Sequence, residues 1–203
     1  MRNSDARAAR NPRTGRMTTQ PVQTPTRLVT GEQLLAMGDF GPCELIDGVV
    51  VSMSPTGERH GFLASRLTSV LYQWSQNTEA GWVMGGEVGI YIRRDPDRIR
   101  AADIAFWSKR RRPDGPSTGF SEVAPDLVVE ILSPTDRWRE MNEKIDDYLS
   151  VDVGELWIVD PSEETVFVYR SPAQRTALRR GDTLSGSGPL NGFTLPIDEL
   201  FTF

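Results

Sequence analysis

The chain contains few residues of the kinds that form covalent cross-links or transition-metal sites. Among its 203 residues there is one cysteine, Cys43, and one histidine, His60. A single cysteine excludes an internal disulfide framework and a multi-cysteine zinc site. A single histidine excludes a two-histidine metal motif within the chain. The groups left for demanding chemistry are carboxylates, lysine and cations that prefer oxygen ligands.

Long apolar runs are also absent. No stretch approaches the roughly 20 apolar residues that a transmembrane helix needs, and no apolar segment follows the first residues as in a secretory signal. We therefore expect a protein without a membrane anchor that is not exported and acts in the cytoplasm. The length suits one domain with one core, and 25% charged residues are typical of a globular chain.

Charge is distributed unevenly along the chain. Residues 1–25 contain five Arg against one Asp, a net charge of +4, so that the remainder of a chain with net charge −5 carries −9. This composition predicts a disordered basic tail over residues 1–25, which either contacts nucleic acid or is simply solvated. Residues 26–203 are expected to form a single domain. Its acidity disfavours non-specific duplex binding but suits a divalent-cation site lined with carboxylates.

Hydrophobic periodicity predicts both helices and strands. Helices are expected where apolar residues recur every three to four positions, and strands where they alternate or run continuously. The predicted helices span residues 30–37, 60–76 and 136–149. The predicted strands span residues 44–46, 49–53, 87–93, 99–107, 126–132, 155–160 and 165–170, with Asp47-Gly48 as the turn of a hairpin and a last strand or turn within residues 192–201.

The order of these elements indicates the fold class. The strand, helix and strand across residues 126–160 form a βαβ unit, whose two strands should be parallel with a right-handed crossover. The hairpin and the antiparallel strands before it should join the unit in one mixed sheet. The expected fold class is therefore α/β or α+β, with helices on the faces of a mixed sheet.

Two acidic residues lie in strands that should otherwise be apolar. Asp103 is flanked by Ala101 and Ala105, and Glu130 lies in the most hydrophobic strand of the chain. A buried carboxylate without a partner is costly, so each of them requires a cation, a metal or a proton. The two side chains either face solvent at a sheet edge or form a site for Mg²⁺ or Mn²⁺. Two such acids on strands expected to be neighbours favour the metal site.

A lysine on the following helix belongs to the same region. At ~100° per residue, Lys144 lies ~40° from Tyr148 around the helix, at the edge of the apolar stripe. It is either a surface lysine whose stem covers apolar residues or, because this helix folds back over the sheet, a cation that reaches the carboxylates. In the second case its removal should cost folding little, because an edge lysine contributes mainly stem packing.

Several segments together, in their order and spacing, resemble one nuclease family. They are Glu44–Gly48 (ELIDG), Ser54-Pro55 with His60 after it, Arg100–Phe106 (RAADIAF), Ala124–Pro134 (APDLVVEILSP), Glu143-Lys144 with Tyr148, Leu156–Pro161 (LWIVDP), Leu195-Pro196 and Glu199–Phe201 (ELF). From about Cys43 to Phe203 the chain resembles the Uma-type "putative restriction endonuclease" family, a branch of the PD-(D/E)XK nuclease superfamily. The resemblance implies a restriction-endonuclease-like fold, a mixed sheet core flanked by helices.

The resemblance also implies roles for individual residues. Asp103 matches the Asp of the superfamily motif and Glu130 its second acid. The superfamily pattern places a lysine two residues after this acid, where both side chains point the same way in a strand, but the residue at that position is Leu132. The family points instead to Lys144 on the following helix. The implied chemistry is metal-assisted phosphodiester hydrolysis with Mg²⁺ (or Mn²⁺) bound by Asp103 and Glu130, together with the carbonyl of Ile131.

Three further features are candidates for the same site. Glu44 and Glu87 are each an outer ligand of the site or an ordinary exposed acid. His60 is either a helix-cap or solvent-facing residue or a contact to phosphate or water. The basic run Lys109, Arg110, Arg111 and Arg112 follows the Asp103 strand, and it is either a solvated loop or a grip on backbone phosphates beside the mouth of the site.

Together these features predict a metal-dependent endonuclease that acts on nucleic acid, with DNA as the favoured substrate. A homodimer would suit an enzyme that cuts both strands of a duplex. Two alternatives are open. Leu132 and the acidic domain favour a catalytically inert, nuclease-like binding or assembly module. The second alternative is a carboxylate-metal enzyme that acts on a phosphoester other than nucleic acid, and the basic run disfavours it.

Overall fold

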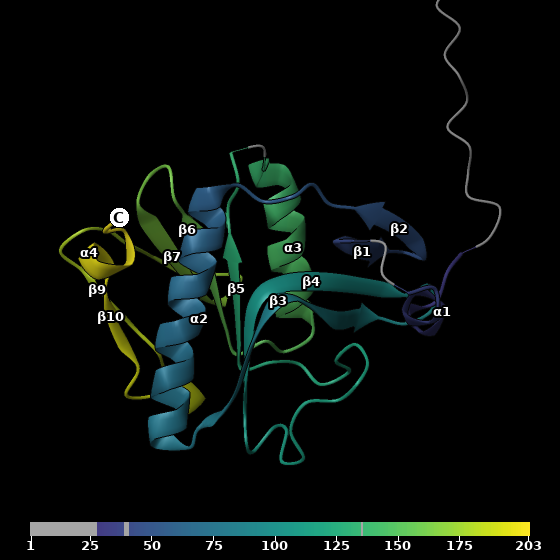
Figure 1. Ribbon diagram of the computed structural model, residues 1–203, viewed down its shortest axis with the longest axis horizontal. Helices are drawn as coiled ribbons and strands as arrows, with labels where there is room; N and C mark the ends of the chain where they lie inside the picture. Colours follow the sequence, from purple (N-terminus) through teal and green to yellow (C-terminus); the bar gives the residue numbers. More distant parts are fainter. Residues whose placement is uncertain (1–27, 39–40, 135) are drawn as a thin grey trace, which may run out of the picture.

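One large mixed sheet with helices on both faces forms the core of the protein (Figure 1). The computed structural model describes residues 28–38, 41–134 and 136–203, and the predicted tail at residues 1–25 lies outside them. The helices are α1 (Gly31–Ala36), α2 (Glu58–Thr78), α3 (Trp138–Ser150) and α4 (Ile197–Leu200), with a 3-10 turn at Gly188–Leu190. The mixed α+β architecture expected from the sequence is confirmed.

The sheet contains both the predicted hairpin and the predicted βαβ unit. Its strands are β1 (Cys43–Ile46), β2 (Val49–Ser52), β3 (Gly81–Arg93), β4 (Arg98–Ser108), β5 (Leu127–Ile131), β6 (Glu155–Asp160), β7 (Thr165–Ser171) and β8 (Gln174–Leu178). They lie in the order β2-β1-β4-β5-β6-β7-β8, and β3 pairs with β4. β5 and β6 are parallel, as a βαβ unit requires. β9 (Thr183–Ser185) and β10 (Thr194–Pro196) pair separately.

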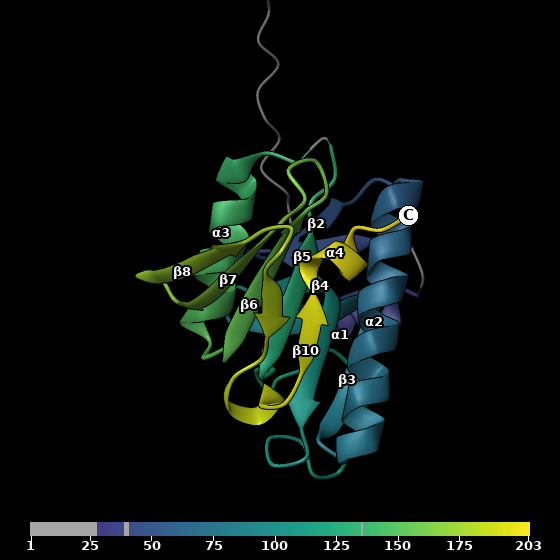
Figure 2. The ribbon, with the colours of Figure 1, turned by 90° about the vertical axis from the view of Figure 1, so that its left-hand side faces the viewer.

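Different elements cover the two faces of the sheet (Figure 2). The buried side of α2 presents Leu63, Leu67 and Leu71, which pack together with residues of β4, β5 and the C-terminal segment. On the opposite face, α3 buries its apolar stripe against β4, β5 and β6. Each fully buried Leu contributes about 1.5–3 kcal/mol through the removal of apolar surface from water. These two layers hold β4 and β5 rigidly between α2 and α3.

The long strand β4 changes its partner along one edge. On that edge β4 pairs with β1 at Ile99 and with β5 from Ile104 to Phe106. Between these two pairings the strands β1 and β5 diverge, and the backbone N–H of Ala101 is donated to the side chain of Glu44 instead. A fork thus opens in the middle of the sheet, between α2 on one face and α3 on the other.

Strand β3 is longer than its alternation predicts. It begins at Gly81 rather than at Glu87, and its register with β4 shifts between Gly85 and Val88. Gly86 and Glu87 have positive φ angles of 90° and 62° at this bulge. Two glycines and a bulge interrupt the strand here, so its first half shows no alternation of apolar and polar residues from which a strand could be predicted.

Two further elements differ from the predictions. α3 begins at Trp138 rather than at Asp136, because Asp136 Oδ2 accepts a hydrogen bond from the Ser133 backbone N–H at 2.8 Å and closes a turn before the helix. Strand β8 was missed because it is an exposed edge strand of mostly polar residues, which has no buried face to impose a pattern.

Candidate active site

Asp103 lies at the point where β4 and β5 separate. The last paired residues before it are Ile104 on β4 and Val129 on β5. Asp103 Oδ2 then accepts a hydrogen bond from the backbone N–H of Ile131 at 2.7 Å. The carboxylate therefore replaces the backbone carbonyl that would accept this hydrogen bond in a regular strand pair, and it holds the end of β5 at the fork.

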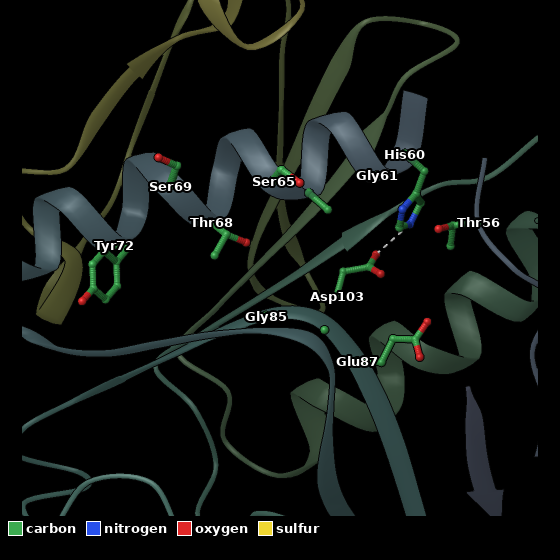
Figure 3. Close-up of a pocket in the computed structure, with 12 residues that line it drawn as sticks. Thr56, His60, Gly61, Ser65, Thr68, Ser69, Tyr72, Gly85, Glu87 and Asp103 are labelled. Carbon is green, nitrogen blue, oxygen red and sulfur yellow. Dashed lines mark ion pairs between the residues drawn. The ribbon is translucent and has the colours of Figure 1, made fainter. Parts of the chain in front are cut away.

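His60 approaches the same carboxylate from the first turn of α2. Its Nε2 lies 3.2 Å from Asp103 Oδ2 (Figure 3). Burial lowers the pKa of His60, but the hydrogen bond and the charge of Asp103 outweigh it and raise the pKa above the ordinary 6.5. His60 Nδ1 is buried and has no hydrogen-bond partner among the described residues. Of the two alternatives for His60, the structure therefore shows a buried residue at the site rather than a solvent-facing one.

Glu130 lies on β5 and is 4% exposed. Lys144 Nζ lies 3.2 Å from its Oε2, and the Tyr148 hydroxyl donates a hydrogen bond to its Oε1 at 2.7 Å. Lys144 and Tyr148 are one turn apart on α3, so one face of this helix supplies both groups. The lysine head group thus lies within a few ångströms of Glu130 although it is 14 positions away in the sequence.

Lys144 has a second carboxylate partner in Glu44. Its Nζ lies 3.0 Å from Glu44 Oε1, and Glu44 Oε2 accepts a hydrogen bond from Arg100 Nη1 at 2.7 Å. Arg100 Nε donates in turn to Asp147 on α3 at 2.7 Å. Glu44 is therefore a buried member of a chain of alternating charges and not an ordinary exposed acid.

The expectation that Lys144 contributes mainly stem packing is wrong. Its side chain is 18% exposed and its ammonium bridges two buried carboxylates. Burial lowers the pKa of Lys144, but the charges of Glu130 and Glu44 outweigh it and raise the pKa above the ordinary 10.5. The lysine consequently keeps its proton at neutral pH.

Glu130 titrates differently from an ordinary glutamate. Burial raises its pKa to about 7, although the charge of Lys144 and the Tyr148 hydrogen bond act in the opposite direction. The negative charges of Asp103 and Glu44 add to the increase. A cation bound nearby would favour the charged form of Glu130 and so lower its pKa.

Glu87 reaches the site from the bulge in β3. Figure 3 shows its carboxylate and that of Asp103 on the same side of the sheet, below the start of α2. Burial and the charge of Asp103 raise the pKa of Glu87 above the ordinary 4.5. The positive φ of 62° at Glu87 belongs to the bulge, so the bulge sets the direction of this side chain.

The acidic groups line one cavity of about 470 Å³, whose walls include Asp103, Glu130, Ile131, Glu87, Lys144 and His60. Carboxylate and carbonyl oxygens are the donors that Mg²⁺ and Mn²⁺ prefer. No group of three or more His, Cys, Asp and Glu suited to hold a metal ion occurs among the described residues. Because Mg²⁺ binds through one or two carboxylates and keeps several waters, Asp103 and Glu130 fit such an ion.

The basic run of residues 109–112 does not lie beside this cavity, so the prediction that it is near the mouth of the site is wrong. It follows the far end of β4, where the Lys109 ammonium lies 3.4 Å from Glu79 after the last turn of α2. His60 lies in the first turn of the same 21-residue helix, which at 1.5 Å per residue spans about 30 Å.

Two of the three arginines of this run are engaged within the fold, whereas Arg110 lines a separate shallow pocket. Arg111 Nε lies 2.8 Å from the buried Asp126, and Arg112 donates to Ser121 at 2.6 Å. Phosphate binding by this loop stays a prediction of the sequence.

Sequence reasoning missed two functional neighbours, Tyr148 and Arg100. Tyr148 fits the apolar stripe of α3, but its position four residues after Lys144 places its hydroxyl on the same face. Arg100 interrupts an apolar strand just as Asp103 does, and this was the available signal that it needs a buried partner.

Comparisons with known proteins agree with this architecture. Residues 30–198 match the model of the Uma2 family, described as "Putative restriction endonuclease". A solved structure from Anabaena variabilis, described as a putative nuclease belonging to DUF820, is similar with a TM-score of 0.74 and 23% sequence identity, covering 85% of this chain and 97% of that chain. This likeness shows a shared fold. No curated protein matches the chain significantly, and no helix in the described ranges is long and apolar enough to cross a bilayer.

Proposed function

Because the chain belongs to the Uma2 family of putative restriction endonucleases, we propose that it is a metal-dependent endonuclease that hydrolyses phosphodiester bonds of DNA. Asp103, Glu130 and Lys144 are the proposed catalytic residues. Glu44 and His60 support them, and Glu87 with the Ile131 carbonyl completes the candidate ligand set. The cofactor we propose is Mg²⁺ or Mn²⁺.

One observation carries this proposal. Leu132 stands where the superfamily pattern has its lysine, and Lys144 brings an ammonium to 3.2 Å from Glu130 by another route. A lysine on a helix is usually directed into solvent, since burying an ammonium is expensive. Burial of this one between two carboxylates, in the cavity that also holds Asp103, supports a catalytic site over an inert relative.

Each side chain has a task that follows from its surroundings. Asp103 and Glu130 would hold the cation, and the hydrogen bonds from Ile131 N–H and His60 fix the orientation of Asp103. The Lys144 ammonium, permanently charged and held in place, would stabilise negative charge that develops on the phosphate or orient the attacking water. When bound, Mg²⁺ or Mn²⁺ lowers the pKa of water and polarises the phosphate.

The proposed function is tested with purified protein, Mg²⁺ or Mn²⁺, and plasmid DNA. We expect Asp103→Asn and Glu130→Gln each to lower the cleavage rate by ~10²-fold or more, because each weakens the binding of the cation that would stabilise the transition state. Calorimetric titration with Mn²⁺ should show weaker binding to both variants than to the wild type. Glu143→Gln is the matched control, since this glutamate is exposed and pairs with Arg139 on the same helix.

Cleavage by Asp103→Asn and Glu130→Gln at the rate of Glu143→Gln would refute the catalytic assignment. The absence of any nuclease activity together with an absence of Mn²⁺ binding would favour the inert module. Homodimerisation and a cytoplasmic location stay predictions of the sequence.

A further inference from the structure

Three cavities meet at His60 and together form a trough across the candidate site. The central cavity, of about 470 Å³, contains the carboxylates already described. A second, of about 490 Å³, extends from His60 toward Trp138 at the start of α3. A third, of about 670 Å³, extends along α2 as far as Tyr72. His60 lines all three cavities, so they adjoin at this residue.

Small side chains keep the α2 branch of the trough open. Ser65 and Thr68 lie on the side of α2 that faces Asp103 and β3 (Figure 3). A Cβ added at Gly61, or at Gly86 across the trough on β3, would meet no atom within 4 Å. The walls therefore offer hydroxyl groups and bare backbone at this place, where a ligand can approach closely.

An aromatic side chain stands at each end of the trough. Tyr72 is 50% exposed and Trp138 is 42% exposed, although both are large and apolar. Trp138 contacts Phe167 edge to face, with ring centroids 5.4 Å apart. Half-exposed aromatic rings along a path of this kind are typical platforms for unpaired bases.

A buried polar atom at the meeting point independently indicates a ligand. His60 is 8% exposed, yet its Nδ1 has no hydrogen-bond partner within the described chain. A buried polar group without a partner costs free energy, and its presence calls for a specific reason. A polar ligand group bound in the trough beside His60 would supply the missing partner.

The charge of the trough selects among nucleic acids. Apart from His60, the basic residues that line it are Arg59 and Lys144, and Lys144 is held by two carboxylates. The lining also contains seven acidic residues, so the trough is acidic and a bound cation has to offset part of this charge when a phosphate enters: Glu58, Glu87, Asp103, Glu130, Asp136, Glu140 and Asp160. Binding of a duplex depends mainly on neutralising many phosphates with Lys and Arg, whereas an unpaired strand gains affinity from stacking of its bases.

We propose that the trough binds a single strand of DNA, with bases stacked on Tyr72 and Trp138 and the phosphate to be cleaved at the carboxylates between them. This inference rests on the proposed nuclease function and deepens it, because it names unpaired DNA as the form of substrate.

The test is a binding measurement that does not depend on cleavage. Fluorescence anisotropy with Ca²⁺, an oxygen-preferring cation used in place of Mg²⁺ or Mn²⁺ to occupy the carboxylates, compares the full-length protein on one labelled oligonucleotide, alone and annealed to its complement. We expect the wild type to bind the single strand at least tenfold more tightly than the duplex. Tyr72→Ala and Trp138→Ala should each weaken single-strand binding by roughly 5- to 100-fold, the range found for the loss of one stacked base.

Gly61→Leu tests the trough without removing a contact. A leucine side chain there enters open space and also has a higher helix propensity than glycine, so the melting temperature should not fall while single-strand binding is lost. Phe62→Ala is the matched control, because this 42% exposed aromatic residue on the same helix contacts Phe203 and does not line the trough. It should leave binding unchanged within about twofold.

Duplex binding as tight as single-strand binding would overturn the inference. Unchanged single-strand binding by Gly61→Leu and Tyr72→Ala would do the same. These outcomes leave the nuclease proposal standing, because that proposal depends on Asp103 and Glu130 and is measured by cleavage. Conversely, inactive protein that binds the single strand through Tyr72 would support the trough and refute only the catalytic assignment.

Discussion

Removal of the Lys144 ammonium is the perturbation that separates an active nuclease from an inert relative most sharply. The Nζ atom lies 3.0 Å from Glu44 and 3.2 Å from Glu130. In Lys144→Ala both carboxylates stay buried and lose their shared cation. We expect two separate consequences, one for stability and one for catalysis.

The size of the stability loss follows from these distances. At an effective dielectric constant of about 20, each contact corresponds to about 5 kcal/mol of Coulomb attraction. The desolvation of the ammonium offsets much of it, and breaking a buried pair typically costs about 3–5 kcal/mol. Because Glu130 already has a pKa of about 7, it takes up a proton easily when the lysine is removed. We therefore expect a loss near the lower limit, about 2–4 kcal/mol, which lowers the melting temperature by roughly 5–15 °C.

The catalytic loss should be larger than this change in stability can explain. We expect Lys144→Ala to lower the cleavage rate by ~10²-fold or more at a temperature where the variant is fully folded. The double variant Lys144→Ala/Glu44→Gln removes a negative charge that repels Glu130 once the lysine is gone, so it should regain part of the stability and none of the activity. Arg139→Ala, which removes an exposed cation of the same helix that pairs with Glu143 at 3.7 Å, is the matched control.

Circular dichroism melting and a plasmid-cleavage time course measure the two effects on the same preparations. Cleavage by Lys144→Ala within threefold of Arg139→Ala would refute the catalytic role. Recovery of activity in the double variant would show that the single variant was inactive only because it was destabilised.

Two further predictions concern the charges around the site. Arg100→Met should lower the free energy of unfolding by about 3–5 kcal/mol, because buried Glu44 loses the closer of its two cationic partners, at 2.7 Å, and Asp147 loses a contact of the same length. Urea denaturation should show that adding Glu44→Gln recovers part of this loss, and an additive loss would contradict the coupling. Hydrogen bonds from Arg98 lower the pKa of Asp47 below its ordinary 3.8, so the stability that Asp47 contributes is present above that pH and is lost as pH falls through the lower, folded-state pKa. The stability difference between wild type and Asp47→Asn should therefore shrink as the pH falls below about 3.8, and a difference that stays constant would refute the prediction.

The architecture was largely predictable because its signals are local. The helix at α3 has an apolar stripe, and β5 is a continuous apolar run with one acid in it. A βαβ connection leaves little freedom of arrangement, since a strand, a helix and a strand return to the same sheet with one handedness. The failures occurred where no buried face imposes a pattern, as in β8, or where a glycine bulge interrupts it, as in β3.

The candidate site was partly predictable for a different reason. Asp103 and Glu130 were recognisable because a charge in an apolar strand is expensive and so demands a partner. Arg100 carried the same signal and was missed, because its partners Glu44 and Asp147 are far away in the sequence. Periodicity predicts that a residue lies at the edge of a helix face, but it does not predict which residues of other elements that side chain contacts.

The sequence by itself determined which residues are costly to bury and therefore which ones had to find partners. The identity of those partners was decided only by the tertiary structure. The divergence of β1 and β5 along one edge of β4 brings Glu44 and Glu130 to Lys144 and places Asp103 in the same cavity as the lysine. The same packing places the basic run at the far end of α2. The physical reason is that burial costs are properties of single side chains, whereas electrostatic compensation depends on distances between segments that only the packed sheet and helices set.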